Sequence, residues 1–434
     1  MASRVQIPLR QIRAVQRDTL GFLRRSFEQH GDFIEYPVGL FSAFQLTAPD
    51  LIEHILLHNY RNYSKETIQF TTLAEVTGQG LLTSSGDHWL KQRRLCQPAF
   101  HRRYLDHMAA VIGQAAERLC QRWQKLAADK TIIDLDAEMM QVTLEIIGEL
   151  LFNADLSDRA GKLTQAVNEL LDYVMYRAYN PLSAVTRHLP TPRQRRFRQA
   201  LALLERLIEQ RSVASGQYSV AGMLAETGMD RTALRDELMT FLIAGHETSA
   251  SGLTWLFYSL SQAEAVRERL ESEVDGLNGR FPTLTDLPQL PYLTQVMQES
   301  LRHFPPSWLI SRRALADDLL RDTAVPRRSY IIISPYTIHH HPDYWPHPDR
   351  FDPDRFAPGQ AEQRPRFAYI PFGGGPRLCI GDRLAQLEMQ LITAMVTQRF
   401  RLRLVEGHPV EPVGRVTIRP RHGMAMRIER KFGS

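Results

Sequence analysis

The hydrophobic pattern of the chain is mainly helical. Apolar residues surround much of the circumference of segments 139–152 and 238–260, and helices that are apolar all round are usually buried. Helical patterns extend over about 85–304 and return at about 382–400. The pattern therefore predicts a mainly α protein with at least one long helix in its interior.

A smaller part of the chain has the pattern of short strands and loops. Prolines become dense in about 305–381, where β-branched runs such as 330–334 also occur. We assign about 30–60 and 401–434 to the same β-rich and loop-rich class. No linker separates these parts, so we expect 1–434 to form one domain.

Composition narrows the class of protein. The chain has 434 residues, 43% hydrophobic and 23% charged, which is typical of a globular protein. Its net charge of +5 includes no long basic tract, so we expect no nucleic-acid partner. Cys96, Cys120 and Cys379 lie far apart, which favours a reducing compartment over a disulfide framework. The sequence shows no secretory signal, and no apolar run approaches the roughly 18 residues that a membrane span needs. We therefore expect a cytoplasmic protein without a transmembrane anchor, and we expect it to be a monomer.

One loop, FGGGPRLCIG at 372–381, carries most of the chemistry. Phe372, Gly375, Arg377, Cys379 and Gly381 follow the spacing F-x-x-G-x-R-x-C-x-G directly before a helix. A thiolate can bind ferric iron, glycines let the backbone approach a flat ring, and an arginine can pair with a ring carboxylate. The alternative is a buried structural cysteine beside a glycine turn, which explains fewer of the matched positions.

This loop resembles the haem loop of the cytochrome P450 family, and further motifs of that family follow the expected order. Glu299 and Arg302 form an E-x-x-R pair on one helix face, and Arg355 lies in a P-x-R-F segment. The segment has Asp354 where the family often has Glu. The resemblance implies that Glu299, Arg302 and Arg355 are structural residues that hold the haem loop in place.

A second motif, AGHET, lies within the most apolar helix. Gly245 costs roughly 1 kcal/mol relative to alanine, and the Thr248 hydroxyl can bond to the carbonyl of Ala244. Glu247 beside Thr248 offers a proton relay, so we predict these two as catalytic residues. The alternative is close helix packing over Gly245, with Glu247 on a solvated edge. His246 is interpreted as a packing residue.

Further residues resemble the family's partners of the haem propionates. Trp89 and Arg93 share one helix face, and we include the adjacent His88 in the predicted cofactor site. Arg313 resembles another propionate partner, although the adjacent Arg312 leaves a swap open.

The resemblance covers about residue 30 to the end and implies monooxygenation by haem b. The haem would lie between the long central helix and the Cys379 loop, with Cys379 as the iron ligand. The other predicted cofactor contacts are Phe372, Gly373, Arg377, Ala244, Gly245 and Gly381. The predicted substrate pocket comprises Phe70, Leu73, Leu82, Ile243, Trp308, Leu309 and Thr417.

The apolar pocket indicates a small hydrophobic substrate besides O2. Two segments, 305–315 and 416–424, look like those of bacterial fatty-acid and carotenoid hydroxylases, which gives a shortlist of fatty acid, terpenoid or carotenoid. Two other functions stay open: a haem-thiolate sensor without turnover, and a peroxide-driven or isomerising relative. The pair of Glu247 and Thr248 argues against both.

Two polar clusters have plain interpretations. His339, His340 and His341 are expected to form a solvated loop without a metal. The arginines at 193, 195, 196 and 198 are expected to line a solvated helix face, with contact to a substrate carboxylate or a membrane surface as the alternative.

Electrons must come from a separate partner. The chain has no G-x-G-x-x-G fingerprint, and its three cysteines are too few for an iron–sulfur cluster. We expect a ferredoxin or flavoprotein reductase fed by NAD(P)H, attracted by Lys91, Arg94, Arg102 and Arg103. If that partner is acidic, the rate of electron transfer should fall as salt is added, whereas a salt-independent rate would contradict the idea.

Overall fold

The computed structural model describes residues 1–8, 11–39, 41–180, 191–214 and 219–431. Its longer helices are α2 (Thr19–His30), α4 (Ile68–Thr77), α5 (Gly86–Cys96), α6 (Leu105–Ala128), α7 (Leu135–Phe152), α8 (Ala160–Tyr179), α10 (Pro192–Ala214), α12 (Arg231–Gln262), α13 (Glu264–Asp275), α14 (Pro291–His303) and α16 (Asp382–Arg399). The shorter helices are α1 (Ile12–Arg17), α3 (Pro49–Glu53), α11 (Val220–Ala225) and α15 (Pro335–Ile338).

In the part of the chain that the structure describes, the strands form one larger sheet and three small ones. The larger sheet has the order β1-β2-β3-β9-β6-β4, the second has the order β10-β13-β5, and β11-β12 and β7-β8 are two-stranded. The strands are β1 (Ser3–Arg4), β2 (Phe33–Val38), β3 (Phe41–Leu46), β4 (Tyr63–Ser64), β5 (Ile132–Asp134), β6 (Ile310–Ala314), β7 (Asp318–Leu320), β8 (Thr323–Val325), β9 (Tyr330–Ile333), β10 (Phe400–Leu404), β11 (Pro412–Gly414), β12 (Ile418–Pro420) and β13 (Ala425–Arg430).

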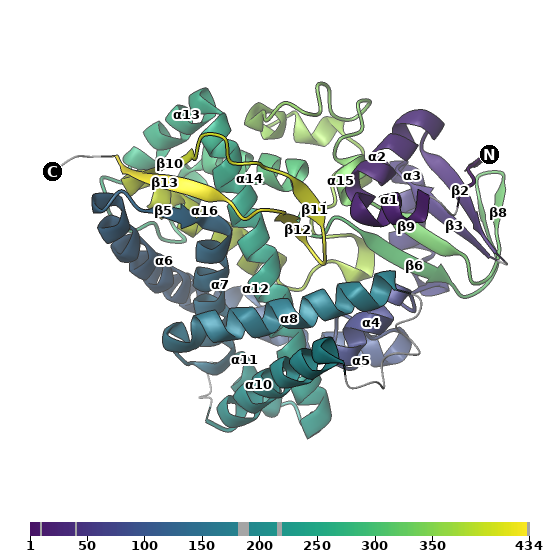
Figure 1. Cartoon of the computed structure of the whole chain (residues 1–434), viewed down its shortest axis with the longest axis horizontal. Coiled ribbons are helices and arrows are strands. Elements are labelled where there is room, and N and C mark those ends of the chain that lie inside the picture. The colour runs from purple at the N-terminus through teal and green to yellow at the C-terminus, as the bar shows by residue number, and fades with distance from the viewer. Residues whose placement is uncertain (9–10, 40, 181–190, 215–218, 432–434) are drawn as a thin grey trace.

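The two main sheets lie at opposite ends of the molecule, with the helices between and below them (Figure 1). In the larger sheet β9 pairs in parallel with β3 and antiparallel with β6, which joins the early and late β-rich parts of the chain. Strand β5 lies inside the stretch that the sequence predicts as helical and pairs with β13. It has only three residues, too short for a recognisable alternating pattern.

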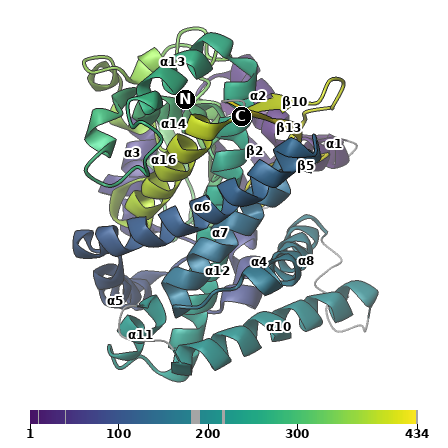
Figure 2. The same cartoon turned by 90° about the vertical axis from the view of Figure 1, so that its left-hand side faces the viewer.

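Helix α12 is the long interior helix that the apolar pattern predicts. Asp230 caps its start by accepting the Ala233 N–H at 2.9 Å. Its 32 residues span about 48 Å at 1.5 Å per residue, and most of those between 236 and 260 are buried. Helix α7 packs along it, and α6, α14 and α16 surround the pair (Figure 2). Within the described residues, no helix is both long and apolar enough to cross a membrane.

The interpretation of His339–His341 as a solvated loop is wrong. All three side chains are buried, because they turn inward directly after α15 and each finds a polar partner. His340 Nδ1 lies 2.7 Å from a backbone carbonyl oxygen, and His341 Nε2 lies 2.9 Å from Asp32 Oδ1. Burial lowers the pKa of His339 to about 3, so its ring is neutral. The four arginines of α10, by contrast, are exposed as expected.

A buried ion pair forms where the E-x-x-R motif predicts it. Arg302 donates to both carboxylate oxygens of Glu299, at 2.6 and 2.8 Å, and both side chains are fully buried. Arg355 approaches the same carboxylate at 3.5 Å, and the Asp352 N–H donates to it at 2.8 Å. The remaining Arg302 donors reach backbone carbonyl oxygens, so neither charge of the pair is left without partners.

This ion pair is connected to the cysteine loop through His339. Arg302 donates to the His339 carbonyl at 2.8 Å, and the His339 ring accepts the Ile370 N–H at 2.8 Å. Tyr369 donates its hydroxyl to the Gln298 carbonyl of α14 at 2.9 Å. The chain just before Phe372 is therefore held to α14 directly through Tyr369 and indirectly through His339, which supports the structural role predicted for the motif.

Replacing Arg302 by Met should lower the free energy of unfolding by about 3–5 kcal/mol, because Glu299 would keep a buried charge without its main partner. Arg403→Met is the matched control, since its pair with Glu429 is exposed and should contribute at most about 1 kcal/mol. Urea denaturation of the haem-bound proteins measures both. Equal destabilisation by the two substitutions would contradict the tethering role of Arg302.

Candidate active site

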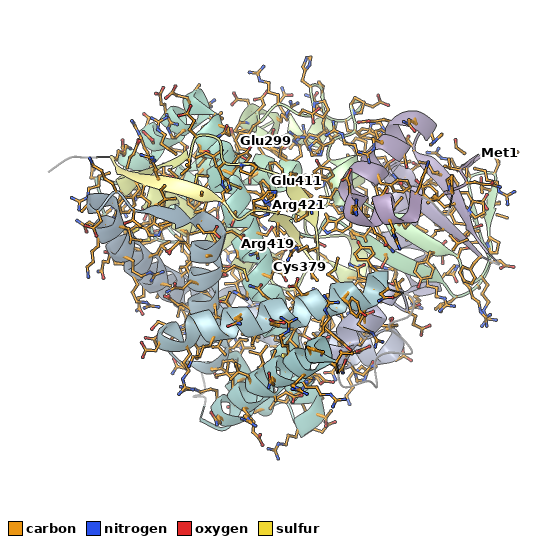
Figure 3. All side chains as sticks on the ribbon, viewed as in Figure 1. Met1, Glu299, Cys379, Glu411, Arg419 and Arg421 are labelled. Carbon is orange, nitrogen blue, oxygen red and sulfur yellow. The ribbon has the colours of Figure 1, made fainter. Side chains whose placement is uncertain are left out.

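A cavity of about 340 Å³ lies between α12, the 372–381 loop, α5 and the β11–β12 hairpin. Figure 3 shows Cys379 near the middle of the molecule, beside α12. The structure brings most of the sequence-predicted site residues to this cavity: Phe70, Leu73, Leu82, Trp89, Arg93, Ile243, Ala244, Gly245, Glu247, Thr248, Leu309, Phe372, Gly373, Arg377, Cys379, Gly381 and Thr417.

The cysteine loop is shaped by its glycines and closed by a backbone bond. Gly375 has a φ of +65°, and a Cβ there would lie 1.9 Å from the Leu56 carbonyl oxygen, so both conformation and space require glycine. The Cys379 N–H donates to the Phe372 carbonyl at 3.1 Å. The thiol is accessible from the cavity although the site lies deep in the protein. Burial raises the pKa of the Cys379 thiol, and the N–H of Gly381 opposes that shift by bonding to the sulfur.

Of the described residues that line the cavity, four are cations that no described carboxylate pairs with. Among the described residues, no carboxylate lies within 4.0 Å of any of them. They donate instead to neutral carbonyl oxygens: Lys65 to Leu82 at 2.8 Å, Arg93 to Leu378 at 3.0 Å, Arg312 to Ser311 at 2.9 Å and Arg377 to Ser84 at 2.9 Å. The wall of the cavity therefore carries a clear excess of positive charge.

The pKa values of these cations are lowered, as expected for positive charges taken out of water without an acidic partner among the described residues. Burial lowers the pKa of Arg312 to about 9, and the neighbouring charge of Arg377 adds to the effect. Burial also lowers the pKa of Arg377 to about 10, and places that of Lys65 well below its ordinary value. A bound group with two carboxylates would relieve this repulsion.

The loop also leaves room for a flat group. Gly381 has an ordinary φ of −98°, and a Cβ there would meet only Phe100, at 4.0 Å. The protein itself therefore does not require glycine at this position, whereas a flat ring lying against the loop would. The exposed thiol, the unpaired cations and this open wall together fit a planar, dianionic group that carries a metal.

The opposite wall presents an acid and an alcohol. Thr248 donates its hydroxyl to the Ala244 carbonyl at 2.6 Å, which confirms the predicted bond. Glu247 is buried, so the alternative of a solvated edge is wrong, and burial raises the pKa of its carboxyl group. Gly245 lines the cavity and also allows close packing, because a Cβ there would lie 2.7 Å from Ile147.

Three predicted site residues lie elsewhere. Arg312, not Arg313, lines the cavity, because neighbouring residues of strand β6 point to opposite faces. His88 is exposed, with its ring 3.2 Å from a backbone carbonyl oxygen outside the cavity. Trp308 is a core residue whose indole N–H donates to the Arg415 carbonyl at 2.8 Å.

Three further residues line the cavity that were not predicted from the sequence: Lys65, Thr240 and Glu388. Thr240 is buried, and its hydroxyl has no partner among the described residues, so it can bond to an oxygen of a ligand. Glu388 bonds to Ser249, and burial raises its pKa to about 8. A usable signal existed for Thr240, since it shares one helical face with Ala244 and Thr248.

The fold and the site define a helical enzyme that holds a flat metal cofactor by a thiolate. The chain belongs to the cytochrome P450 family, whose model matches residues 8–424. Cyclooctatin synthase from Streptomyces melanosporofaciens is 34% identical over 411 residues, which cover 91% of this chain and 88% of that protein. Protein LUTEIN DEFICIENT 5, chloroplastic, from Arabidopsis thaliana is 33% identical over 93% of this chain and 73% of its own.

A solved structure confirms the fold. The crystal structure of CYP175A1 from Thermus thermophillus matches with a TM-score of 0.82 and 27% sequence identity, covering 98% of this chain and 100% of that one. The predicted mainly α cytochrome P450 fold is therefore correct. The protein is a cytochrome P450 monooxygenase with haem b as its cofactor, supplied with electrons from NAD(P)H through partner proteins.

Replacing Arg312 by Leu should speed the loss of haem by about ten- to a hundredfold, because a charge-assisted bond contributes roughly 1.5–3 kcal/mol. Arg313→Leu removes the same charge from the other face of β6 and should leave the rate near that of the wild type. Transfer of haem to an excess of an acceptor protein measures both rates. The account fails if Arg313→Leu loses haem as fast as Arg312→Leu.

Proposed function

We propose that this cytochrome P450 hydroxylates a neutral terpenoid. The observation that carries the proposal is the charge distribution in the cavity: its cations are Lys65, Arg93, Arg312 and Arg377, as far as the structure describes the lining. If these pair with the carboxylates of the cofactor, a fatty-acid carboxylate has no cationic partner left among the described wall residues. A neutral, largely apolar substrate fits that wall better.

The names of several relatives support the same class of substrate. Besides cyclooctatin synthase, the Streptomyces melanosporofaciens protein cyclooctat-9-en-7-ol 5-monooxygenase is 33% identical over 91% of this chain. Pentalenene oxygenase from Streptomyces avermitilis is 29% identical over the same share. These names describe oxidation of terpenoids by proteins that resemble this chain along most of its length.

The residues around the cavity divide into a cofactor side and a reaction side. Cys379 would hold the iron, while Trp89, Arg93, Arg312, Arg377 and Lys65 would hold the ring carboxylates. Haem bound through a thiolate supplies the activation of O2 and the cleavage of its O–O bond. The protein orients the substrate, excludes water and supplies protons.

Glu247 and Thr248 form the proton supply in this proposal. The Glu247 carboxyl group is buried beside the cavity, and the Thr248 Oγ1 atom can accept a proton while its own hydrogen is held by the Ala244 carbonyl. A sensor without turnover would have no use for this pair, which favours an enzyme that consumes protons.

The electron donor is proposed to be an acidic ferredoxin or flavoprotein. Lys91, Arg94, Arg102 and Arg103 are all exposed in the region of α5 and the turn before α6. Exposed charges of one sign steer an oppositely charged protein partner.

Titration with a neutral cyclic terpene and with a fatty acid of similar carbon number tests the substrate class. The terpene should bind at least about tenfold more tightly, since the carboxylate would lose solvation without gaining a cationic partner. The change in the haem spin-state spectrum reports binding. Tighter binding of the fatty acid would contradict the proposal.

Thr248→Ala should keep the haem. The share of electrons that end in hydrogen peroxide should rise about tenfold or more, because the proton-transferring hydroxyl is gone. Thr248→Ser retains a hydroxyl and serves as the control. Peroxide formed per NAD(P)H consumed is the measurement. An unchanged share in the Ala variant would remove Thr248 from the relay.

A further inference from the structure

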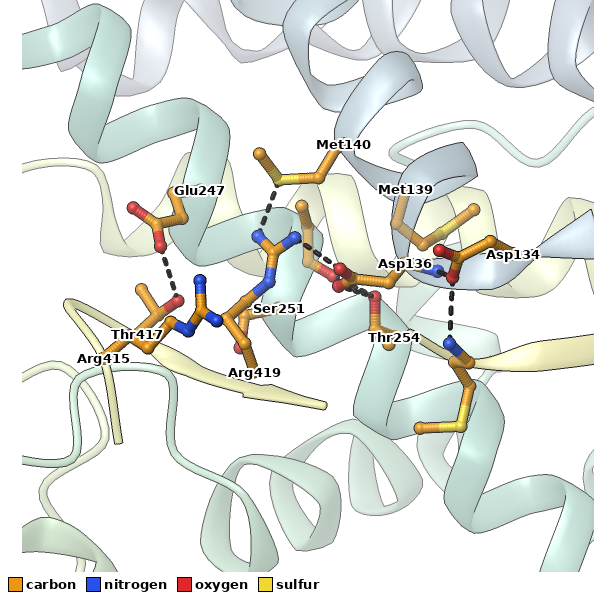
Figure 4. A network of polar contacts seen from close by, with 12 residues as sticks. Asp134, Asp136, Met139, Met140, Glu247, Ser251, Thr254, Arg415, Thr417 and Arg419 are labelled. Atoms are coloured by element: carbon orange, nitrogen blue, oxygen red, sulfur yellow. Dashed lines mark hydrogen bonds and ion pairs between the residues drawn. The ribbon is translucent and has the colours of Figure 1, made fainter. Parts of the chain in front are cut away.

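The hairpin that closes the cavity also contacts the catalytic acid. Between β11 and β12 the chain passes over α12, and Val416 and Thr417 line the cavity. Figure 4 shows the Thr417 hydroxyl pointing at the Glu247 carboxylate, with Arg419 next along the hairpin. From the sequence, Thr417 is predicted only to line the substrate pocket, so the contact with Glu247 indicates a second role.

The contact is short, buried and directed at one oxygen of the acid. Thr417 Oγ1 donates to Glu247 Oε1 at 3.0 Å, and the two residues are only 2% and 5% exposed. Glu247 Oε2 is buried without a partner among the described residues. One carboxylate oxygen is thus fixed while the other is left available for proton exchange.

The hairpin can hold the acid because it is itself fixed to the protein. Ser251 and Trp255 of α12 both donate to the Ile418 carbonyl, at 2.6 and 2.9 Å. On its other side, Trp308 donates to the Arg415 carbonyl. The backbone on both sides of Thr417 is therefore anchored independently of Glu247.

Charged groups around the acid come from the hairpin and from α7. Arg419 and Arg415 of the hairpin favour the charged form of Glu247, and Asp136 of α7 opposes it. Arg419 is held away from the acid, since it donates to Asp136 and to the Met140 sulfur (Figure 4). The arginines therefore act on Glu247 through charge, whereas Thr417 is the group that bonds to its carboxylate.

We propose that Thr417 is a positioning residue that holds the Glu247 carboxyl group at the cavity wall with Oε2 free to exchange a proton. This inference rests on the proposed proton relay of Glu247 and Thr248. Without the Thr417 hydroxyl, the carboxyl group would rotate about its terminal torsion, which has only a weak preference of its own. The acid would then be present in the wall but unfavourably oriented.

Comparison of Thr417→Val with Thr417→Ser separates this role from simple pocket lining. Valine keeps the shape and removes the hydrogen bond, so peroxide formed per product should rise about two- to tenfold, as expected for one lost hydrogen bond. Serine should restore the wild-type ratio. Ser259→Ala is the matched control, because it removes a buried hydroxyl of α12 that bonds to the Trp255 backbone carbonyl and not to the hairpin or to Glu247.

Two further measurements report on the acid itself. The Thr417 hydroxyl lowers the pKa of Glu247 by bonding to its carboxylate, so the pH midpoint of coupling should move upward in Thr417→Val and stay in place in Ser259→Ala. The infrared carboxyl band that disappears in Glu247→Gln should shift in Thr417→Val of the resting haem protein.

The outcomes distinguish the two proposals. If Glu247→Gln raises peroxide formation but Thr417→Val leaves the ratio, the pH midpoint and the infrared band unchanged, the positioning role of Thr417 is wrong. If Glu247→Gln leaves peroxide formation unchanged, the relay itself is wrong and the inference about Thr417 is lost with it.

Discussion

The buried pair of Glu299 and Arg302 is the constraint on which the site depends. A carboxylate and a guanidinium group taken fully out of water are tolerated only when every donor and acceptor finds a partner, and here the partners are the backbone segments that lead to the cysteine loop. Arg302 bonds to the His339 carbonyl, and the His339 ring in turn accepts the N–H of Ile370, two residues before Phe372. The cavity wall that carries Cys379 is therefore fixed by charge satisfaction elsewhere in the fold.

The cavity is electrostatically incomplete in the protein alone. Among the described residues, Arg312 and Arg377 have no carboxylate partner, and burial lowers the pKa of both. Such cations disfavour the folded state until an anionic group joins them. Haem b, which the family carries, supplies two carboxylates. Cofactor binding should thus contribute to stability through these cations as well as through the thiolate.

Sequence patterns predicted the parts of the site that have a strong local signature. The apolar helix around Thr248 and the glycine–cysteine loop both lie at the cavity as predicted. Helical periodicity and the placement of glycines can be recognised within about ten residues. The choice between Arg312 and Arg313 could not be predicted from the local sequence, because it depends on which face of β6 meets the cavity. The pairing of β6 with β9 and β4 sets that register. The burial of His339 was not predicted for a related reason, since its partners, Arg302 and Ile370, lie far away in the chain.

The central claim is that Cys379, deprotonated, is the haem ligand, and the absorption spectrum of the reduced carbon monoxide adduct tests it most directly. A thiolate donates electron density to the iron, so the account predicts the main band at the long wavelength typical of thiolate-bound haem. The band should lose that position in Cys379→His. A fully haem-loaded, intact wild-type protein with its band at the shorter wavelength of nitrogen-bound haem would contradict the account.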